Sequence, residues 1–181
     1  MDILTQRLRL RSLAPRDAGA LIAHLNDWQV ARWLARPPYP YSAADAEAFI
    51  ALVRERHRRP HPLLFALADR DEDRLIGTIG IEPDGACGGE LGYWIGQPFW
   101  GRGFGREAAT AIIGAAAAAG LEHVNAYADP LNARSVRLLQ GCGFRPDGYA
   151  TRPTRAAPAS MRRFVLVLSP DGLRRSGAAP T

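Results

Sequence analysis

Apolar and polar residues alternate along several short stretches of this chain, which is the pattern of β-strands that bury one face. In the first stretch, residues 5–13, Leu8 and Leu10 alternate with Arg9 and Arg11. The arginines are therefore expected on the exposed face of a strand near the edge of a sheet. The other predicted strands are residues 63–68, 75–81, 90–96 and 124–128, a strand that begins at Phe144, and residues 161–168.

Between the strands, apolar residues recur at intervals of three and four, the spacing of helices with one buried face. A first helix is expected to start at residues 14–17. Ser42 is expected to cap a second helix, with Asp45 completing a capping box. Residues 105–119 and 132–141 are predicted as two further helices.

The segment between the first two helices is expected to be irregular. Residues 30–35 are predicted to form a short turn, and residues 36–41 contain three prolines. Proline fixes φ and has no backbone N–H, so residues 36–41 are predicted to be non-helical.

This order of strands and helices predicts an α/β (α+β) fold, in which a mixed, mostly antiparallel sheet of about seven strands carries helices on both faces. With 181 residues and 47% hydrophobic content, the chain is long enough for one buried core and too short for two. Residues 1–169 are therefore predicted to form a single domain. The small and polar residues of 170–181 are predicted to form a flexible tail.

Composition narrows the functional classes without choosing among them. No apolar run reaches the length of a membrane span and the N-terminus lacks the features of a signal peptide, so the protein is expected to be soluble and cytoplasmic. Cys87 and Cys142 are too few for a disulfide framework, and neither stands at a metal-ligand spacing from a histidine, so no metal is expected. The net charge of +5 comes from arginines spread along the chain, which favours anionic partners only weakly, and nucleic acid is not expected.

Residues 89–109, GELGYWIGQPFWGRGFGREAA, carry the clearest chemical signal. A predicted strand breaks and is followed by Gly101, Gly103 and Gly105 and then by an alanine-rich helix. A glycine turn at the start of a helix presents free backbone N–H groups at the positive end of the helix dipole, where no side chain blocks approach. The stretch therefore predicts an anion site, and a phosphate site in particular.

Two familiar phosphate loops do not fit these residues. A Walker loop needs Gly-Lys-Ser/Thr, and the chain contains no lysine. A dinucleotide fingerprint G-x-G-x-x-G that begins at Gly101 finds Arg106 in place of its last glycine, and it lies in the middle of the chain. A glycine turn that only joins a strand to a helix is the remaining alternative.

The run Trp100-Gly101-Arg102-Gly103-Phe104-Gly105 resembles the acetyl-CoA loop, Q/R-x-x-G-x-G/A, of the GNAT superfamily of N-acetyltransferases. Trp100 stands where the general pattern has Gln or Arg, but an aromatic-Trp-Gly lead-in is usual in the Rim-type branch, which acetylates the N-termini of ribosomal proteins. The opening T-x-R-L-x-L-R-x-L-x-x-x-D-A and a later N-x-x-S-x-x-L-x-x-x-x-G-F are similar to the same superfamily. The resemblance thus extends over nearly the whole chain and implies the GNAT fold.

The resemblance implies acetyl-CoA as co-substrate, lying in a cleft where residues 90–96 and 124–128 splay apart. A backbone N–H at Trp94 or Ile95 would stabilise the oxyanion of the reaction, and a core position is the alternative for Trp94. The CoA pyrophosphate would be held by backbone N–H groups and arginine charge of the glycine loop. The loop residues assigned to cofactor binding are Arg102, Gly103, Phe104, Gly105 and Arg106.

Two polar residues of the later motif are candidates for contact with the pantetheine arm and the sulfur. Asn132 would bind the pantetheine amides, and Ser135 would return a proton to the thiolate. Asn is also a favoured N-cap and Ser suits a first helical turn, so a structural role is the alternative for both. Leu139 occupies the position at which many GNAT enzymes have a tyrosine acid, which places more weight on Ser135 or on water.

A base is needed to take a proton from the acceptor ammonium, and an exposed carboxylate with a pKa of about 4 serves poorly unless burial raises that pKa. Glu90, at the head of the central strand, is the first candidate, and Glu82 is the second. Pairing with an arginine is the alternative for each, and a water chain would then remove the proton. Glu107, at the start of the helix that follows the glycine loop, is expected to stabilise that helix.

In the GNAT family the region before the second strand forms a wall of the acceptor pocket, which makes Trp33, Tyr39 and Tyr41 candidate substrate-binding residues. Packing against the core is the alternative for each. The resemblance implies direct acetyl transfer to a primary amine, either a protein N-terminus or a small-molecule amine, by a monomer or homodimer. The alternatives are a non-catalytic acyl-CoA-binding module and, from the charge alone, a nucleic-acid-binding protein.

Overall fold

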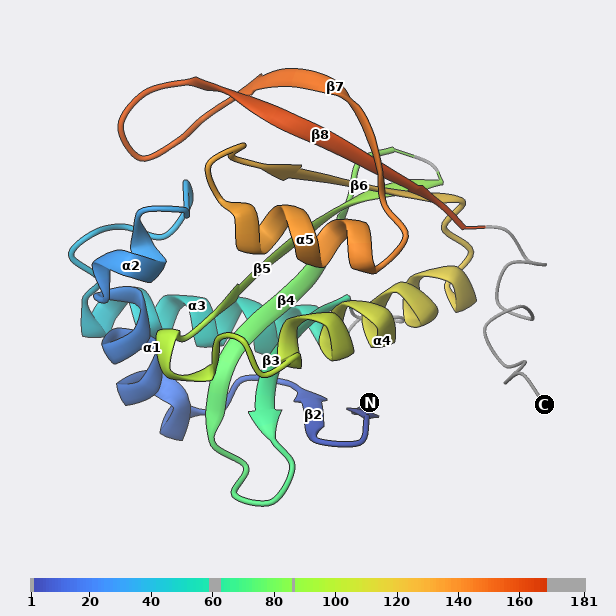
Figure 1. The fold of residues 1–181 in the computed structure, drawn as a ribbon. Coiled ribbons are helices and arrows are strands. Elements are labelled where there is room, and N and C mark those ends of the chain that lie inside the picture. Colours follow the sequence, from blue (N-terminus) through green and yellow to red (C-terminus); the bar gives the residue numbers. More distant parts are fainter. Residues whose placement is uncertain (1, 59–62, 86, 169–181) are drawn as a thin grey trace.

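The computed structural model describes residues 2–58, 63–85 and 87–168, whose strands form one eight-stranded sheet in the order β1-β2-β3-β4-β5-β6-β8-β7 (Figure 1). The strands are β1 (Ile3–Leu4), β2 (Leu8–Arg11), β3 (Leu64–Asp69), β4 (Leu75–Pro83), β5 (Gly88–Ile95), β6 (His123–Ala128), β7 (Arg145–Arg152) and β8 (Ala159–Val167). The helices are α1 (Ala18–Leu25), α2 (Trp28–Ala31), α3 (Ala43–Arg56), α4 (Phe104–Ala118) and α5 (Ala133–Gly141), with short 3₁₀ helices η1 (Pro15–Asp17) and η2 (Gln97–Phe99).

Neighbouring strands of the sheet are antiparallel, except that β5 and β6 are parallel. The predicted mixed, mostly antiparallel sheet is therefore confirmed. The extra strand beyond the expected seven or so is β1, which pairs with β2 at the sheet edge. Two residues are too few to show an alternation, so the sequence pattern did not reveal it.

Helices cover both faces of the sheet, as predicted (Figure 1). The core under α4 and α5 contains Phe65 and Leu67 of β3, whereas Ala66 between them belongs to the core under α1 and α3. Successive side chains of a strand point to opposite faces, so each central strand contributes to both cores.

The segment between α1 and α3 begins with a helical turn that the sequence pattern did not predict. A turn was expected over residues 30–35. This expectation was wrong for residues 30 and 31, because they are helical and belong to α2, which ends at Ala31. Asp27 stabilises this turn by accepting a 2.9 Å hydrogen bond from the backbone N–H of Gln29. Residues 36–41 are non-helical, as their prolines require, and the predicted capping box at the start of α3 is present.

Arg11 departs from the exposed position that its alternation predicted, since the residue is only 4% exposed. Its guanidinium donates to the carboxylate of Asp17 at 2.7 and 2.9 Å and to Asp73 at 2.7 Å. The hydrogen bonds that Arg11 donates to these carboxylates, that to Asp17 first, raise its pKa against the effect of burial. This paired charge ties β2 to η1 and to the turn between β3 and β4.

Strands β5 and β6 separate before either one ends. Their parallel pairing joins residues 88–91 to residues 123–126. Beyond this point β5 pairs only with β4, and β6 pairs only with β8. The splay that the resemblance implied is therefore present, and it leaves an open strand edge along residues 92–95 in the middle of the sheet.

Other expectations from the sequence concern features away from this opening. Cys87 and Cys142 are both free thiols. Within residues 2–58, 63–85 and 87–168, no helix is long and apolar enough to cross a bilayer, and no cluster of His, Cys, Asp and Glu side chains is arranged to hold a metal ion. The predicted flexible tail, residues 170–181, lies outside the described residues.

Candidate functional site

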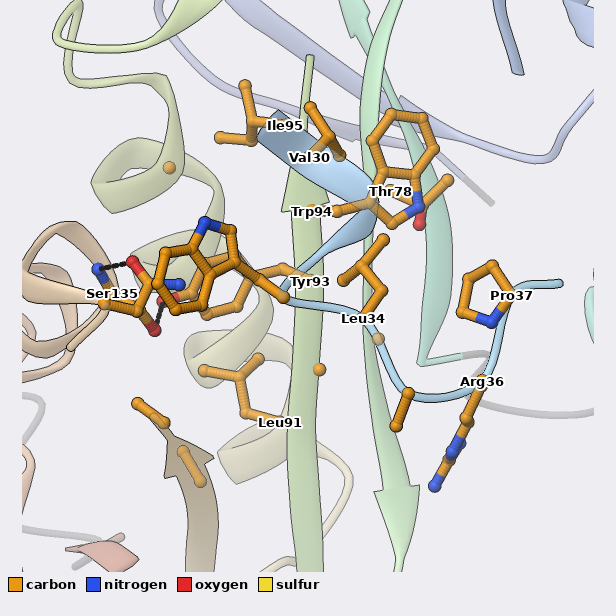
Figure 2. Close-up of a pocket in the computed structure, with 18 of the residues that line it drawn as sticks. Val30, Leu34, Arg36, Pro37, Thr78, Leu91, Tyr93, Trp94, Ile95 and Ser135 are labelled. Atoms are coloured by element: carbon orange, nitrogen blue, oxygen red, sulfur yellow. Dashed lines mark hydrogen bonds between the residues drawn. The ribbon is translucent and has the colours of Figure 1, made fainter. Parts of the chain in front are cut away.

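The separation of β5 from β6 opens into a large cleft with a volume of about 1090 Å³. Its walls come from β4, β5 and β6, the loop between α2 and α3, the N-terminal ends of α4 and α5, and β7. Figure 2 shows Tyr93 and Ser135 on one side of this cleft and Leu34, Arg36 and Pro37 of the α2–α3 loop on the other. A cleft of this size accommodates a large, elongated ligand.

The open edge of β5 presents backbone groups to the cleft. Gly96 donates its N–H to a carbonyl of β4 at 2.9 Å, and because the direction of these groups alternates along a strand, Trp94 also faces β4. Ile95 faces the opposite way, since its carbonyl oxygen accepts a 2.7 Å hydrogen bond from Nε1 of Trp100. By the same alternation the N–H groups of Tyr93 and Ile95 point into the cleft.

This geometry separates the two residues that were candidates for the oxyanion donor. Trp94 borders the cleft, but its backbone pairs with Thr78 and its side chain is 8% exposed in the core under α1 and α3. Trp94 is therefore corrected to a core residue, which was its alternative. Ile95 keeps the candidate role, and Tyr93 joins it.

The glycine loop ends in an open helix N-terminus at the edge of the cleft. Gly101 and Gly103 have φ angles of 74° and 81°, in the left-handed region that other residues rarely adopt. Gly103 is the N-cap of α4 and has no side chain to pair with the first N–H groups of the helix. The N–H groups of Phe104, Gly105 and Arg106 therefore lie at the positive end of the α4 dipole.

Gly105 and Phe104 each have a packing role in addition to their backbone position. A Cβ atom at Gly105 would lie 2.5 Å from Cδ1 of Leu138, so the glycine lets α4 and α5 approach each other. The ring of Phe104 is buried beside Phe99, with 6.5 Å between the ring centroids. Only the backbone of these loop residues is available to a ligand.

Arginine side chains add positive charge around this helix end, although not all of those predicted. Arg106 lines the cleft, whereas Arg102 is exposed outside it. Arg134 and Arg137 of α5 line the cleft as well, and sequence analysis did not single them out. The guanidinium carbon of Arg134 lies 3.8 Å from the centroid of the Trp100 ring, which fixes it beside the loop.

An ion pair between Arg7, which directly precedes β2, and Glu107 of α4 holds the glycine loop in place. The Arg7 guanidinium contacts the Glu107 carboxylate through Nε at 2.8 Å and Nη2 at 2.7 Å, and its Nη1 donates to the carbonyl oxygen of Arg102 at 2.8 Å. The hydroxyl of Thr5 donates to the same carboxylate at 2.6 Å. Burial alone would raise the pKa of Glu107, but these hydrogen bonds and the charge of Arg7 hold it below its ordinary value.

Ser135 lies at the N-terminal end of α5, next to a tyrosine that the sequence analysis missed. The side-chain oxygen of Asn132 accepts a 3.2 Å hydrogen bond from the backbone N–H of Ser135, so Asn132 is the N-cap of α5, as its alternative role predicted. The Ser135 hydroxyl is 2.8 Å from the hydroxyl of Tyr93 (Figure 2). The alternation of β5 places Tyr93 on the same face as Ile95, which is the signal that would have found it.

Tyr93 is half-buried against the core, and desolvation raises its pKa to about 12, although the hydrogen bond with Ser135 acts in the opposite direction. The phenol is protonated at neutral pH, as an unperturbed tyrosine also is, and can donate to Ser135. Leu139, where many GNAT enzymes carry a tyrosine, is fully buried in the core. A phenol thus reaches the cleft from β5 instead of from α5.

Both candidate carboxylates line the cleft, and both are paired with arginines. Glu90 of β5 contacts Arg152 of β7, and Glu82 of β4 contacts Arg56 of α3. These pairs are the alternative that the sequence analysis gave for each residue. The guanidinium of Arg152 also lies over the ring of Tyr127, 4.2 Å from its centroid, so Glu90 is tied into a wider contact.

The three aromatic residues expected at the acceptor wall have different positions. Trp33 lines the cleft. Tyr41 borders it but is 5% exposed and packed in the core, where burial raises its pKa to about 12. Tyr39 does not line the cleft, because its ring turns outward and packs against Trp28 with 5.3 Å between the centroids. The expectation of direct substrate contact is therefore not met by Tyr39.

Comparison with known proteins shows the family of this chain and its fold. A match to the family described as acetyltransferase (GNAT) domain covers residues 7–145. The ribosomal protein uS5 alanine N-acetyltransferase of Escherichia coli (strain K12) is 31% identical over 161 residues, which cover 82% of this chain and 80% of the relative.

Solved structures share the fold. The ribosomal-protein-S5-alanine acetyltransferase from Vibrio fischeri has a TM-score of 0.79 at 20% identity, covering 94% of this chain and 98% of that chain. Mycobacterium smegmatis RimJ in complex with CoA-disulfide has a TM-score of 0.75 at 20% identity, covering 88% of this chain and 81% of that chain. These likenesses show a shared fold.

The contacts of Glu107 predict an acid-dependent stability. Because its folded pKa lies below the ordinary value of 4.5, the carboxylate stabilises the fold fully above that value and loses this effect as the pH falls through the folded pKa. Glu107→Gln should therefore lower the unfolding free energy by about 1 to 2 kcal/mol at neutral pH, with the difference closing in acid. Urea unfolding of the wild type and the variant, at neutral pH and in acid, measures this difference in unfolding free energy. Glu72→Gln, which removes one partner of an exposed ion pair, is the control. A difference that stays constant with pH would contradict the assignment.

Proposed function

This chain belongs to the GNAT acetyltransferase family, and on that premise we propose that it transfers the acetyl group of acetyl-CoA directly to a primary amine. The observation that carries the proposal is the meeting of three features in one cleft: the open edge of β5, the open N-terminus of α4, and the Tyr93–Ser135 pair. The open edge of β5 suits the pantetheine arm of CoA, and the open N-terminus of α4 suits its pyrophosphate. The Tyr93–Ser135 pair suits the sulfur that leaves as a thiolate.

The residues around the cleft fit acetyl-CoA as a co-substrate. The N–H groups of residues 104–106 would hold the pyrophosphate, with charge from Arg106, Arg134 and Arg137. The N–H groups along the open edge of β5 would pair with the spaced amides of the pantetheine arm, much as a further strand would. The complex of the RimJ neighbour with a CoA-disulfide supports this placement.

The chain supplies a group for each charge that develops during transfer. As a neutral amine attacks the thioester carbonyl, the N–H of Ile95 would donate to the oxygen that becomes negative. When the C–S bond breaks, the hydroxyl of Ser135 would give its proton to the thiolate and regain one from water. Tyr93, whose phenol is protonated at neutral pH, would donate to Ser135 and so turn the serine proton toward the sulfur.

The proton of the amine needs a different route. Glu90 and Glu82 line the cleft, but each carboxylate is held by an arginine. The proposal therefore assigns proton removal to water in the cleft. Arg152 would have to release Glu90 before that carboxylate could act as the base.

The acceptor in this proposal is a protein N-terminal amine or a small primary amine. The relative that acts on alanine of ribosomal protein uS5 supports the first choice. CoA-thiol release from acetyl-CoA should be measured with Ala- and Ser-initiated peptides, aminoglycosides, polyamines and free amino acids, beside thermal unfolding with and without CoA. Release with one class selects the acceptor, and no release together with no stabilisation by CoA would overturn the proposal.

Gly103→Glu should abolish CoA binding, because it puts a carboxylate where the pyrophosphate is to lie. Gly120→Glu is a matched control: Gly120 follows the other end of α4, has a φ of 88°, and has open space around it. Both variants carry similar backbone strain, about 1 to 2 kcal/mol. Titration calorimetry should show CoA binding weakened by about 100-fold or more at position 103 only. Equal affinities in the two variants would contradict the loop assignment.

Ser135→Ala should lower kcat by about 100-fold and leave the Kd of CoA nearly unchanged. The variant keeps the α5 cap, because that bond uses the backbone N–H of Ser135 and not its hydroxyl. Tyr93→Phe should lower kcat less, by about tenfold, since Ser135 loses only its orienting partner. Steady-state kinetics with the acceptor found in the panel measures both effects, with Ser160→Ala on β8 as the control. An unchanged kcat in Ser135→Ala would return Ser135 to a purely structural role.

A further inference from the structure

Arg155 connects two segments that lie far apart in the sequence. It stands in the connection between β7 and β8, and its guanidinium donates to backbone carbonyls at both ends of residues 31–37. Nε is 3.2 Å from the oxygen of Ala31, and Nη2 is 2.8 Å from the oxygen of Pro37. Figure 1 shows this connection beside the loop that follows α2. One side chain therefore fastens the start of the α2–α3 loop at two points.

An aromatic stack on the outside strengthens the same connection. The guanidinium carbon of Arg155 lies 5.4 Å from the centroid of the Tyr39 ring, and that ring packs against Trp28. Tyr39 and Trp28 are 44% and 49% exposed, which is unusual for such large rings unless they hold something in place. Tyr39 thus packs on the outer side of the α2–α3 loop and does not line the cleft.

The fastened loop and the β7 side are two walls of the same cleft. Residues 33–38 all line it, and Arg152 and Pro153 line it from the β7 side. Arg155 itself does not line the cleft, so it joins the two walls from outside the space that they enclose. Arginine suits this role, because its planar fork donates to two carbonyls at once and a lysine ammonium has no such geometry.

We propose that Arg155 is a specificity-determining residue of the acceptor site, an inference that rests on the proposed acetyltransferase function. Holding residues 33–38 against the β7–β8 connection keeps the acceptor end of the cleft narrow. An amine on a slender, extended segment enters, and an amine flanked by a large side chain does not. The same contact orders the wall before the acceptor arrives, which reduces the ordering cost of binding. Arg155 acts through the wall and is a positioning residue.

The test compares Arg155→Ala and Arg155→Lys with the wild type on two peptides that differ only in an N-terminal Ala or Trp. Arg145→Ala, at an exposed position of β7 in the same hairpin, is the matched control. Arg155→Ala should raise the KM of the Ala peptide by about tenfold and shift kcat/KM toward the Trp peptide by a similar factor. Arg155→Lys should give a KM and a peptide preference between those of the wild type and Arg155→Ala. The KM of acetyl-CoA should not change in either variant.

An unchanged KM and an unchanged peptide preference in Arg155→Ala would overturn the inference. An equal rise in the KM of the peptide and in the KM of acetyl-CoA would also overturn it, because such a result indicates a general structural role. Hydrogen exchange of the amides of residues 31–36 needs no acceptor and should be faster in Arg155→Ala than in the wild type and Arg145→Ala. If the wild type releases no CoA with any acceptor of the panel and is not stabilised by CoA, the proposed function fails, and unchanged exchange in Arg155→Ala would separately overturn the fastening of the wall.

Discussion

The structure depends on a β-sheet whose central strands separate before they end. A buried backbone N–H or C=O group without a partner costs about 1 to 3 kcal/mol, so a strand edge inside a domain persists only where something else pairs with it. Here β5 and β6 part after Leu91, and Trp100 satisfies the exposed carbonyl of Ile95. The N–H groups of Tyr93 and Ile95 stay open to the cleft. The centre of the fold thus has a place for one more extended chain with spaced amides, and we propose that the pantetheine arm of CoA occupies it.

The elements around this opening are fixed at its two ends. At the N-terminus of α4, the Arg7–Glu107 pair ties this helix to the segment that leads into β2, and Gly105 lets α4 lie close to α5. At the acceptor end, Arg155 holds the α2–α3 loop against the β7–β8 connection. Between them, Tyr93 and Ser135 bring two hydroxyls together from β5 and α5. The opening is therefore held by contacts between elements that are distant in the sequence.

Periodicity and glycine placement predicted the strands other than β1, the four longer helices and the start of α4, because these depend on local sequence. The resemblance supplied the splay. Long-range pairing was not predictable in this way: an alternating strand gives no sign that Arg11 turns inward to Asp17, or that Arg152 engages Glu90. Tyr93 was missed because its partner, Ser135, lies 42 residues away. Tyr39 was assigned to the wrong side of its loop, since a proline-rich segment has no period from which a direction can be inferred.

The most direct test of the central claim is amide hydrogen exchange by NMR with and without CoA. If the open edge of β5 binds the pantetheine arm and α4 binds the pyrophosphate, the amides of Tyr93, Ile95 and residues 104–106 become strongly protected when CoA is added. The amide of Gly96, already bonded to β4, should change little by comparison. Protection confined to other surfaces, with the amides of Tyr93 and Ile95 exchanging as in the free protein, would contradict the account.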